Sequence, residues 1–294
     1  MKKPLFTGAC TALVTPFLEN NVNYPMLEQL LRRQIDAGIH AVVICGTTGE
    51  APTLSDAEKL ELFKRAKAYV GSDCLIIAGT GSNSTKHTLE LSLSAEKMNV
   101  DALLLVSPYY NKANPEGLYQ HYETVARAVD LPIILYNVPS RTGVSCTAET
   151  YRALSSHPNI IGVKEASGNQ NLIQKTIDLC PDDFYVWSGN DDETAATMLL
   201  GGTGVISVVS NVAPEMMLAL TNACLAGNFS EAGKLQIKVR KLADVLFREV
   251  NPIPVKTALS VMGLCEEIFR LPLCRLNEAH RAELTETLEA YSLL

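Results

Sequence analysis

The sequence has few of the features that mark membrane or nucleic-acid-binding proteins. No run approaches the ~20 apolar residues that a membrane-spanning helix needs. The net charge is -7, and no cluster of lysines and arginines is available to bind a phosphate backbone. Residues 1–17 carry two lysines, but Thr7, Thr11, Thr15 and Pro16 interrupt their apolar run too early for a signal peptide. We therefore expect a first strand there and small molecules as ligands.

Cysteine and histidine patterns typical of metal sites or disulfide frameworks are also missing. The eight cysteines are widely spaced without a CxxC pair, and the five histidines show no HExxH or other zinc-binding spacing. The cysteines lie mostly within apolar segments. We therefore expect buried thiols in a reducing, cytoplasmic environment and no metal centre.

What the sequence does have is apolar residues, at 47% of the chain, and eight short β-branched runs. Nearly every residue in each run is apolar, which indicates strands covered on both faces, as in a parallel sheet. The runs are 8–14, 41–46, 75–81, 102–108, 132–139, 160–167, 184–190 and 204–211.

Amphipathic segments separate these runs, and some begin with helix-capping residues, such as Ser55 with Glu58, and Ser84. The runs start about 20 to 35 residues apart, which is the size of one strand, one helix and two loops. The pattern predicts an α/β fold, a (β/α)8 TIM barrel. The alternative is an open doubly wound sheet, but the GxGxxG turn typical of that fold does not follow the first run.

Four more helical patterns follow the last run, at 214–226, 230–249, 252–263 and 277–290. The first completes the barrel, and the other three are surplus to it. We therefore expect a catalytic barrel domain over 1–226 and a C-terminal helical extension over 227–294. No linker rich in proline, glycine or serine separates the two.

Reacting groups of such barrels lie at the C-terminal ends of the strands, because the loops there surround one cavity. On the sixth run Ile160, Gly162 and Lys164 share one face by strand alternation, and Glu165 points to the other. Lys164 would then point into the barrel mouth. A random strand-end lysine more often extends to solvent or pairs with a neighbouring carboxylate. A partly desolvated lysine, in contrast, has its neutral form favoured and attacks carbonyls to form an imine.

Other polar residues gather on the same rim. Tyr136 faces inward on the neighbouring strand and is a candidate proton donor and acceptor, or else a core tyrosine. Arg141 suits a substrate carboxylate, or is a solvated loop arginine. The turn 46–50, GTTGE, offers backbone N–H groups and two hydroxyls to a small carboxylate, although many tight turns look alike.

An imine lysine also occurs in enzymes that use pyridoxal phosphate. The segment 201–204, GGTG, has the glycine content of a phosphate loop, but it precedes the eighth run and so lies on the opposite rim. No GxxxxGK is present. The pattern therefore favours an imine formed directly with the substrate and no cofactor.

These motifs together resemble the pyruvate-dependent class I aldolase family that includes dihydrodipicolinate synthase and N-acetylneuraminate lyase. The resemblance runs from about Thr7 to residues 251–256 and on into the tail. It is carried by CGTTGE, SPYYNK, LYNVPSRTG, IIGVKEASG and SGND. It implies condensation of pyruvate with L-aspartate 4-semialdehyde in the diaminopimelate and lysine pathway, in a homo-oligomer that is usually a tetramer of two tight dimers.

The resemblance also implies a role for each matching residue. Lys164 would form the imine with pyruvate, and Thr47, Tyr136 and a neighbouring subunit's tyrosine at position 110 (Tyr110 here) would relay protons. The substrate-binding residues would be Thr48 and Thr47 for the pyruvate carboxylate, Arg141 for the semialdehyde carboxylate, and Gly189 and Ile206 beside the imine.

Two questions of specificity remain after this assignment. Thr47, Thr48 and Arg141 are the residues found at these positions in the synthases and not in the sialate lyases. A sialate lyase, a 2-keto-3-deoxy sugar acid aldolase and an inactive binding protein nevertheless remain alternatives.

Inhibition by free lysine is the second question. In members inhibited by lysine, histidines and a glutamate stand where this chain has Asp56, Lys59 and His87, whereas Asn83 and Tyr109 are retained. We therefore expect weak or absent inhibition by lysine.

Overall fold

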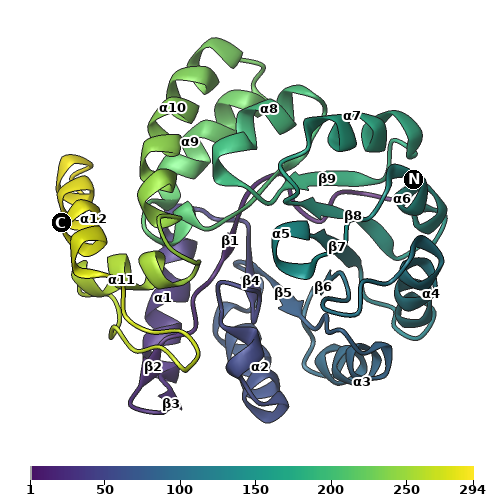
Figure 1. Ribbon diagram of the computed structural model, residues 1–294, viewed down its shortest axis with the longest axis horizontal. Helices are drawn as coiled ribbons and strands as arrows, with labels where there is room; N and C mark the ends of the chain where they lie inside the picture. The colour runs from purple at the N-terminus through teal and green to yellow at the C-terminus, as the bar shows by residue number, and fades with distance from the viewer. Residues whose placement is uncertain (1) are drawn as a thin grey trace.

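The structure, a computed structural model, describes residues 2–294 and confirms the closed parallel barrel. Eight strands pair in parallel around the barrel in chain order, and the last closes on the first (Figure 1). They are β1 (Gly8–Ala12), β4 (Ala41–Ile44), β5 (Leu75–Gly79), β6 (Ala102–Val106), β7 (Ile133–Asn137), β8 (Ile160–Glu165), β9 (Tyr185–Ser188) and β10 (Gly204–Ser207). All eight predicted runs contain one of these strands, but most runs extend beyond it into the loop that follows.

Eight helices alternate with the strands and surround them (Figure 1). They are α1 (Tyr24–Ala37), α2 (Asp56–Val70), α3 (Thr85–Glu96), α4 (Pro115–Ala126), α6 (Ala148–Ser155), α7 (Gln170–Leu179), α8 (Thr194–Leu199) and α9 (Pro214–Leu225). Ser55 and Glu58 form a capping box at the start of α2, and Ser84 caps α3, as predicted.

Short elements on the loops were not predicted. They are a hairpin of β2 (Phe17–Leu18) and β3 (Asn21–Val22), the one-turn helix α5 (Pro139–Thr142), and the 3-10 turns η1 (Ala51–Thr53), η2 (Asp191–Glu193) and η3 (Val209–Asn211). The helix α5 contains Arg141, and η1 follows the GTTGE turn.

Three helices follow the barrel: α10 (Phe229–Leu246), α11 (Ile253–Val261) and α12 (Glu278–Ala290). Figure 1 shows α11 and α12 at one side of the barrel, with the end of the chain beyond α12. We propose that the barrel domain ends at Ala226, directly after α9, and that 227–294 form the extension. No helix within residues 2–294 is both long and apolar enough to cross a membrane.

The apolar core consists of two separate clusters, because successive side chains of each strand point to opposite faces. The smaller cluster fills the barrel and contains Cys10, Leu104, Tyr136, Trp187 and Ile206, which all come from different strands. The larger cluster lies between the strands and the helices. Both faces of the sheet are therefore covered, which accounts for the continuous apolar runs.

The cysteines follow the prediction with one exception. Seven are buried, but Cys274, in the loop between α11 and α12, is exposed. Burial raises the pKa of the Cys74 thiol to about 12 and that of Cys146 to about 11, so these thiols stay protonated and weakly reactive. Cys274 lacks this protection because its loop lies at the surface.

Candidate active site

Lys164 lies near the end of β8 and points into the barrel. It is paired in register with Tyr136 on β7, and its Nζ is 4.4 Å from the centre of the Tyr136 ring. Only 5% of Lys164 and 6% of Tyr136 is exposed. The alternative of a lysine that extends to solvent is thereby excluded, and an amine and a phenol share one small space inside the barrel.

The side chain of Ile160 does not face the inside of the barrel, so the prediction for β8 is wrong at this residue. The pairing of β7 with β8 is irregular at Ile133 and Ile134, so that Ile160 packs on the outside of the barrel and Ile161 packs inside. Such a bulge inserts one residue and shifts the alternation on one side of it. Gly162 and Lys164 still face inward, because they lie after the irregularity.

Glu165 points away from Lys164, as predicted, and has partners of its own. Its carboxylate accepts hydrogen bonds from Asn137, Tyr151 and the Ser167 backbone N–H. Burial raises the pKa of Glu165, although these hydrogen bonds act in the opposite direction. The carboxylate therefore links the end of β7, helix α6 and the loop after β8, and it does not form an ion pair with the lysine.

Gly189 lies beside Lys164, and Ile206 lies in the apolar cluster inside the same barrel. A Cβ on Gly189 would lie 3.1 Å from Lys164 Cε and 2.6 Å from Ala166 Cβ, so only glycine fits without displacing a neighbour. Ile206 is fully buried and belongs to the cluster inside the barrel, with Tyr136. The backbone of Gly189 therefore lies close to the lysine stem, where a side chain would not fit.

A cavity of about 600 Å³ opens at this rim. Thr47, Tyr136 and Arg141, from the loops and ends of β4 and β7, contribute to its walls. Lys164 and Thr48 do not line it, and Lys164 adjoins it through Tyr136. The volume suits a small molecule and is typical of a substrate cavity.

The GTTGE turn holds its two threonines in different environments. Backbone hydrogen bonds from Gly49 to Gly46 and from Glu50 to Thr47 close the turn. Thr47 is partly exposed at the cavity, whereas Thr48 is buried and its Oγ1 accepts a hydrogen bond from Asn251 Nδ2 at 3.0 Å. Asn251 was not predicted as a site residue, although it opens the segment 251–256, to which the resemblance extends.

Asn251 also holds Arg141 at the cavity. Its guanidinium donates from Nη2 to the backbone carbonyl of Asn251 at 3.1 Å, and the rest of the side chain is exposed. An arginine with free N–H groups in this position can bind a carboxylate. It is therefore not a freely solvated loop arginine.

Tyr110 does not join the other predicted residues. Its side chain is 84% exposed, its backbone has a positive φ of 73°, and it does not line the cavity. The Tyr110 backbone N–H bonds to the Thr142 carbonyl, which fixes the residue beside the loop that carries Arg141. Its aromatic ring therefore projects from the rim into solvent.

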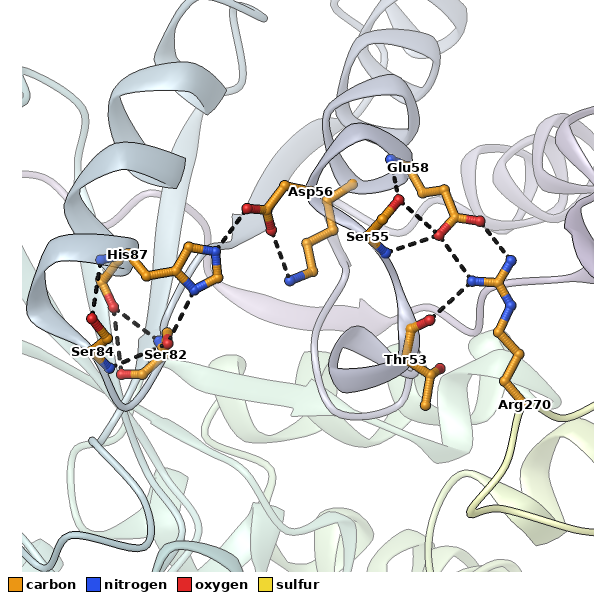
Figure 2. Close-up of polar contacts among 10 residues, drawn as sticks. Thr53, Ser55, Asp56, Glu58, Ser82, Ser84, His87 and Arg270 are labelled. Atoms are coloured by element: carbon orange, nitrogen blue, oxygen red, sulfur yellow. Dashed lines mark hydrogen bonds and ion pairs between the residues drawn. The ribbon is translucent and has the colours of Figure 1, made fainter.

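The candidate lysine-binding region lies on the same cavity, and its polar groups contact one another (Figure 2). His87 Nε2 lies 2.8 Å from Asp56 Oδ2, and Lys59 Nζ lies 3.5 Å from Asp56 Oδ1. His87 Nδ1 contacts Ser82 Oγ at 3.3 Å. Tyr109 also lines the cavity, whereas Asn83 does not.

Comparisons with known proteins identify the family of the chain. The model of the Dihydrodipicolinate synthetase family matches residues 5–291. A 4-hydroxy-tetrahydrodipicolinate synthase of Acetivibrio thermocellus is 45% identical over the whole length of both chains. The chain belongs to the dihydrodipicolinate synthetase family.

Solved structures of this family superpose closely on the chain. A dihydrodipicolinate synthase from Acinetobacter baumannii, in complex with pyruvate, has a TM-score of 0.96 and 42% identity, over 98% of this chain and all of that one. A monomeric dihydrodipicolinate synthase variant has a TM-score of 0.97 and 42% identity, over 99% and 98% of the two chains. The predicted resemblance and fold are confirmed, and family membership makes the chain a lyase.

Groups that could hold a metal or a phosphate-bearing cofactor were sought around the barrel. Within residues 2–294, no three histidine, cysteine or acidic side chains are grouped as metal ligands. The GGTG segment precedes β10 and therefore lies at the N-terminal rim, away from Lys164. Sequence reasoning placed this segment correctly.

Proposed function

We propose that the chain catalyses the 4-hydroxy-tetrahydrodipicolinate synthase reaction, the aldol condensation of pyruvate with L-aspartate 4-semialdehyde. The reaction belongs to the diaminopimelate and lysine pathway. The observation that carries the proposal is the position of Lys164, buried on the inner wall with its amine against Tyr136 and beside a cavity. The full-length match to synthases supports the substrate pair.

The chemistry begins with attack of the Lys164 amine on the keto carbon of pyruvate. The resulting carbinolamine loses water when a proton reaches its oxygen, and the Tyr136 hydroxyl is the candidate acid. The protonated imine loses a methyl proton and becomes an enamine, which attacks the semialdehyde. The amino group that the semialdehyde carries then attacks the imine carbon and displaces the Lys164 amine, which closes the ring and releases the enzyme. This sequence needs no metal or organic cofactor.

The remaining predicted residues take roles that fit their positions. Thr47 lies on the cavity wall and relays protons with Tyr136, while Thr48 and Thr47 bind the pyruvate carboxylate. Arg141 binds the semialdehyde carboxylate, since its guanidinium stands at the rim. Gly189 and Ile206 shape the wall beside the imine.

Tyr110 completes the relay in the proposed oligomer. Its exposed ring is suited to enter the site of a partner subunit, which implies at least a dimer and, by family habit, a tetramer of two dimers. One solved relative is a monomeric variant, so family membership alone does not fix the assembly. We also place the protein in the cytoplasm, where buried thiols stay reduced.

We further propose that lysine inhibits this chain weakly or not at all. The Asp56 carboxylate already contacts His87 and Lys59, so the ammonium group of a ligand would have to compete with both. His87 also stands where inhibited members carry a glutamate. A free acid to pair with the ligand is therefore missing from this corner of the cavity.

Activity assays separate the proposed reaction from its alternatives. Purified protein is given pyruvate with the semialdehyde, and in parallel sialic acid and 2-keto-3-deoxy sugar acids. The proposal expects condensation and little cleavage of the sugar acids. Preferred cleavage of a sugar acid would assign the chain to another branch of the aldolases.

A further inference from the structure

One residue of the C-terminal extension contacts two substrate-binding loops at once. Asn251 lies between α10 and α11, and only 5% of it is exposed. Its side-chain Nδ2 donates to Thr48 Oγ1 after β4, and its backbone carbonyl accepts from Arg141 after β7. The two contacts use different parts of the residue, so a side-chain substitution alters only the first.

We propose that Asn251 is a positioning residue that orients the Thr48 hydroxyl toward the carboxylate of pyruvate. The inference rests on the proposed function, because it takes Thr48 as a ligand of that carboxylate. Asn251 does not itself contact the reacting atoms in this account. It acts through Thr48, and its effect should appear in pyruvate binding before it appears in chemistry.

The number of hydrogen bonds that the Thr48 hydroxyl can make limits where its proton can point. A threonine Oγ1 has one proton to donate and two lone pairs to accept with. Because the Asn251 amide occupies one lone pair, the Thr48 proton cannot point toward Asn251 and has to point elsewhere. A carboxylate only accepts hydrogen bonds, so a hydroxyl whose proton faces it is a better ligand than one that rotates freely.

The contact is held in place by a second link between the extension and the same turn. Lys256 on α11 forms a fully buried ion pair with Glu50, two residues after Thr48, with Nζ to Oε1 at 2.6 Å. The Lys256 ammonium also lies 4.0 Å from the centre of the Phe17 ring. A buried pair of this kind is costly to break, so α11 and the turn keep a fixed relation.

The Asn251 side chain has no other partner in residues 2–294. Its Oδ1 is buried without a hydrogen bond, and Nδ2 bonds only to Thr48. Replacement by alanine therefore removes a single hydrogen bond. Replacement by aspartate keeps the shape but turns the donor into an acceptor, which draws the Thr48 proton away from the substrate.

The test is steady-state kinetics on Asn251→Ala and Asn251→Asp with each substrate varied in turn. The KM for pyruvate should rise about tenfold in the alanine variant, the effect of one misdirected hydrogen bond, and further in the aspartate variant. The KM for the semialdehyde should change less than about twofold, because the carbonyl that holds Arg141 is retained. If Asn251 only filled space, the KM for pyruvate would rise more in the alanine variant than in the aspartate variant, because aspartate has nearly the same shape as asparagine.

A double-mutant cycle with Thr48→Val shows whether the effect passes through Thr48. In the Thr48→Val background, Asn251→Ala should change the KM for pyruvate less than about twofold. An equal effect in both backgrounds would overturn the inference, and so would an unchanged KM in the single variants. Asn277→Ala, which removes the N-cap of α12 in the same extension, is the matched control and should keep the wild-type KM.

If the proposed function itself were wrong, the experiments would give a different result from a failure of the Asn251 inference alone. In that case the wild-type protein would form no imine with pyruvate, or would form it and cleave a sugar acid in preference to condensing the semialdehyde. If the imine forms normally and Asn251 variants bind pyruvate as the wild type does, only the positioning role is wrong. Thermal unfolding of each variant identifies a fold defect, and the aspartate isostere provides the test if the alanine variant is unstable.

Discussion

Lys164 and Tyr136 occupy paired positions on neighbouring parallel strands, with the lysine amine 4.4 Å from the centre of the tyrosine ring. Both side chains are buried inside the barrel. A nucleophile and a candidate acid are thus fixed by backbone pairing and not by mobile loops. Substitutions at these two positions can therefore test the first chemical steps.

Removal of the Tyr136 hydroxyl should slow proton transfer. Tyr136→Phe keeps the ring that packs against Lys164, so kcat should fall about 10²- to 10⁴-fold with a small change in the KM for pyruvate. Steady-state assays measure both. Tyr69→Phe, on the outer helix α2 where Tyr69 contacts Arg32, is the control and should keep its activity. Retention of more than about a tenth of kcat by Tyr136→Phe would remove the tyrosine from the relay.

Tyr110 should act in the site of a partner subunit. Lys164→Ala and Tyr110→Phe should each be nearly inactive alone. In a mixed dimer the Tyr110→Phe protomer keeps its lysine and receives an intact tyrosine from its partner, so one site is complete. Coexpression should restore about a quarter of wild-type activity, since half the dimers are mixed and have one complete site of two. Without recovery, Tyr110 acts within its own chain, and a Tyr110→Phe variant that is active alone would remove Tyr110 from the relay.

Lysine should be a poor inhibitor. Because Asp56 is already held by His87 and Lys59, we expect a half-inhibiting lysine concentration above about a millimolar. Initial rates at saturating substrates and rising lysine measure it. Half-inhibition well below that concentration would show that the ligand displaces these contacts.

His121 on α4 should make the fold sensitive to mild acid. It is buried, its Nδ1 contacts Thr85, its Nε2 has no partner within residues 2–294, and burial lowers its pKa to about 4. An unfolded histidine titrates near ~6.5, so between these values the unfolded chain binds more protons. The free energy of unfolding should therefore fall by about 3 kcal/mol as the pH drops from about 6.5 to about 4.

Urea unfolding of His121→Gln at several pH values checks this. The variant should lack that part of the pH dependence, whereas His40→Gln, at an exposed histidine, should keep it. A wild-type slope in His121→Gln would mean that another group is responsible.

The fold could be predicted from the sequence because apolar runs and capping residues report local structure. Ser55 and Glu58 marked the start of α2 correctly, and each of the eight runs contained a strand. The strand ends were less well placed, because the loop residues after them are also buried. The outward position of Ile160 could not be predicted, since a bulge depends on the pairing between strands and not on alternation within one.

In the candidate site, too, some residues could be predicted from local patterns and others could not. Lys164 and Tyr136 could be selected because strand alternation and the C-terminal rim place them together. Asn251 could not, because its contacts with Thr48 and Arg141 join positions separated by 203 and 110 residues. Such contacts depend on how the extension packs, which no local pattern reports. The positions of Thr47, Gly189 and Ile206 fit the roles implied by the resemblance, and those roles remain predictions.

The most direct test of the account is mass spectrometry of the protein after borohydride reduction in the presence of pyruvate. Wild-type protein should gain one reduced pyruvyl group, and peptide mapping should place it on Lys164. Lys86→Ala, at an exposed lysine, should behave as the wild type, whereas Lys164→Ala should remain unmodified. An adduct on another lysine, or a Lys164→Ala variant with full turnover, would contradict the account.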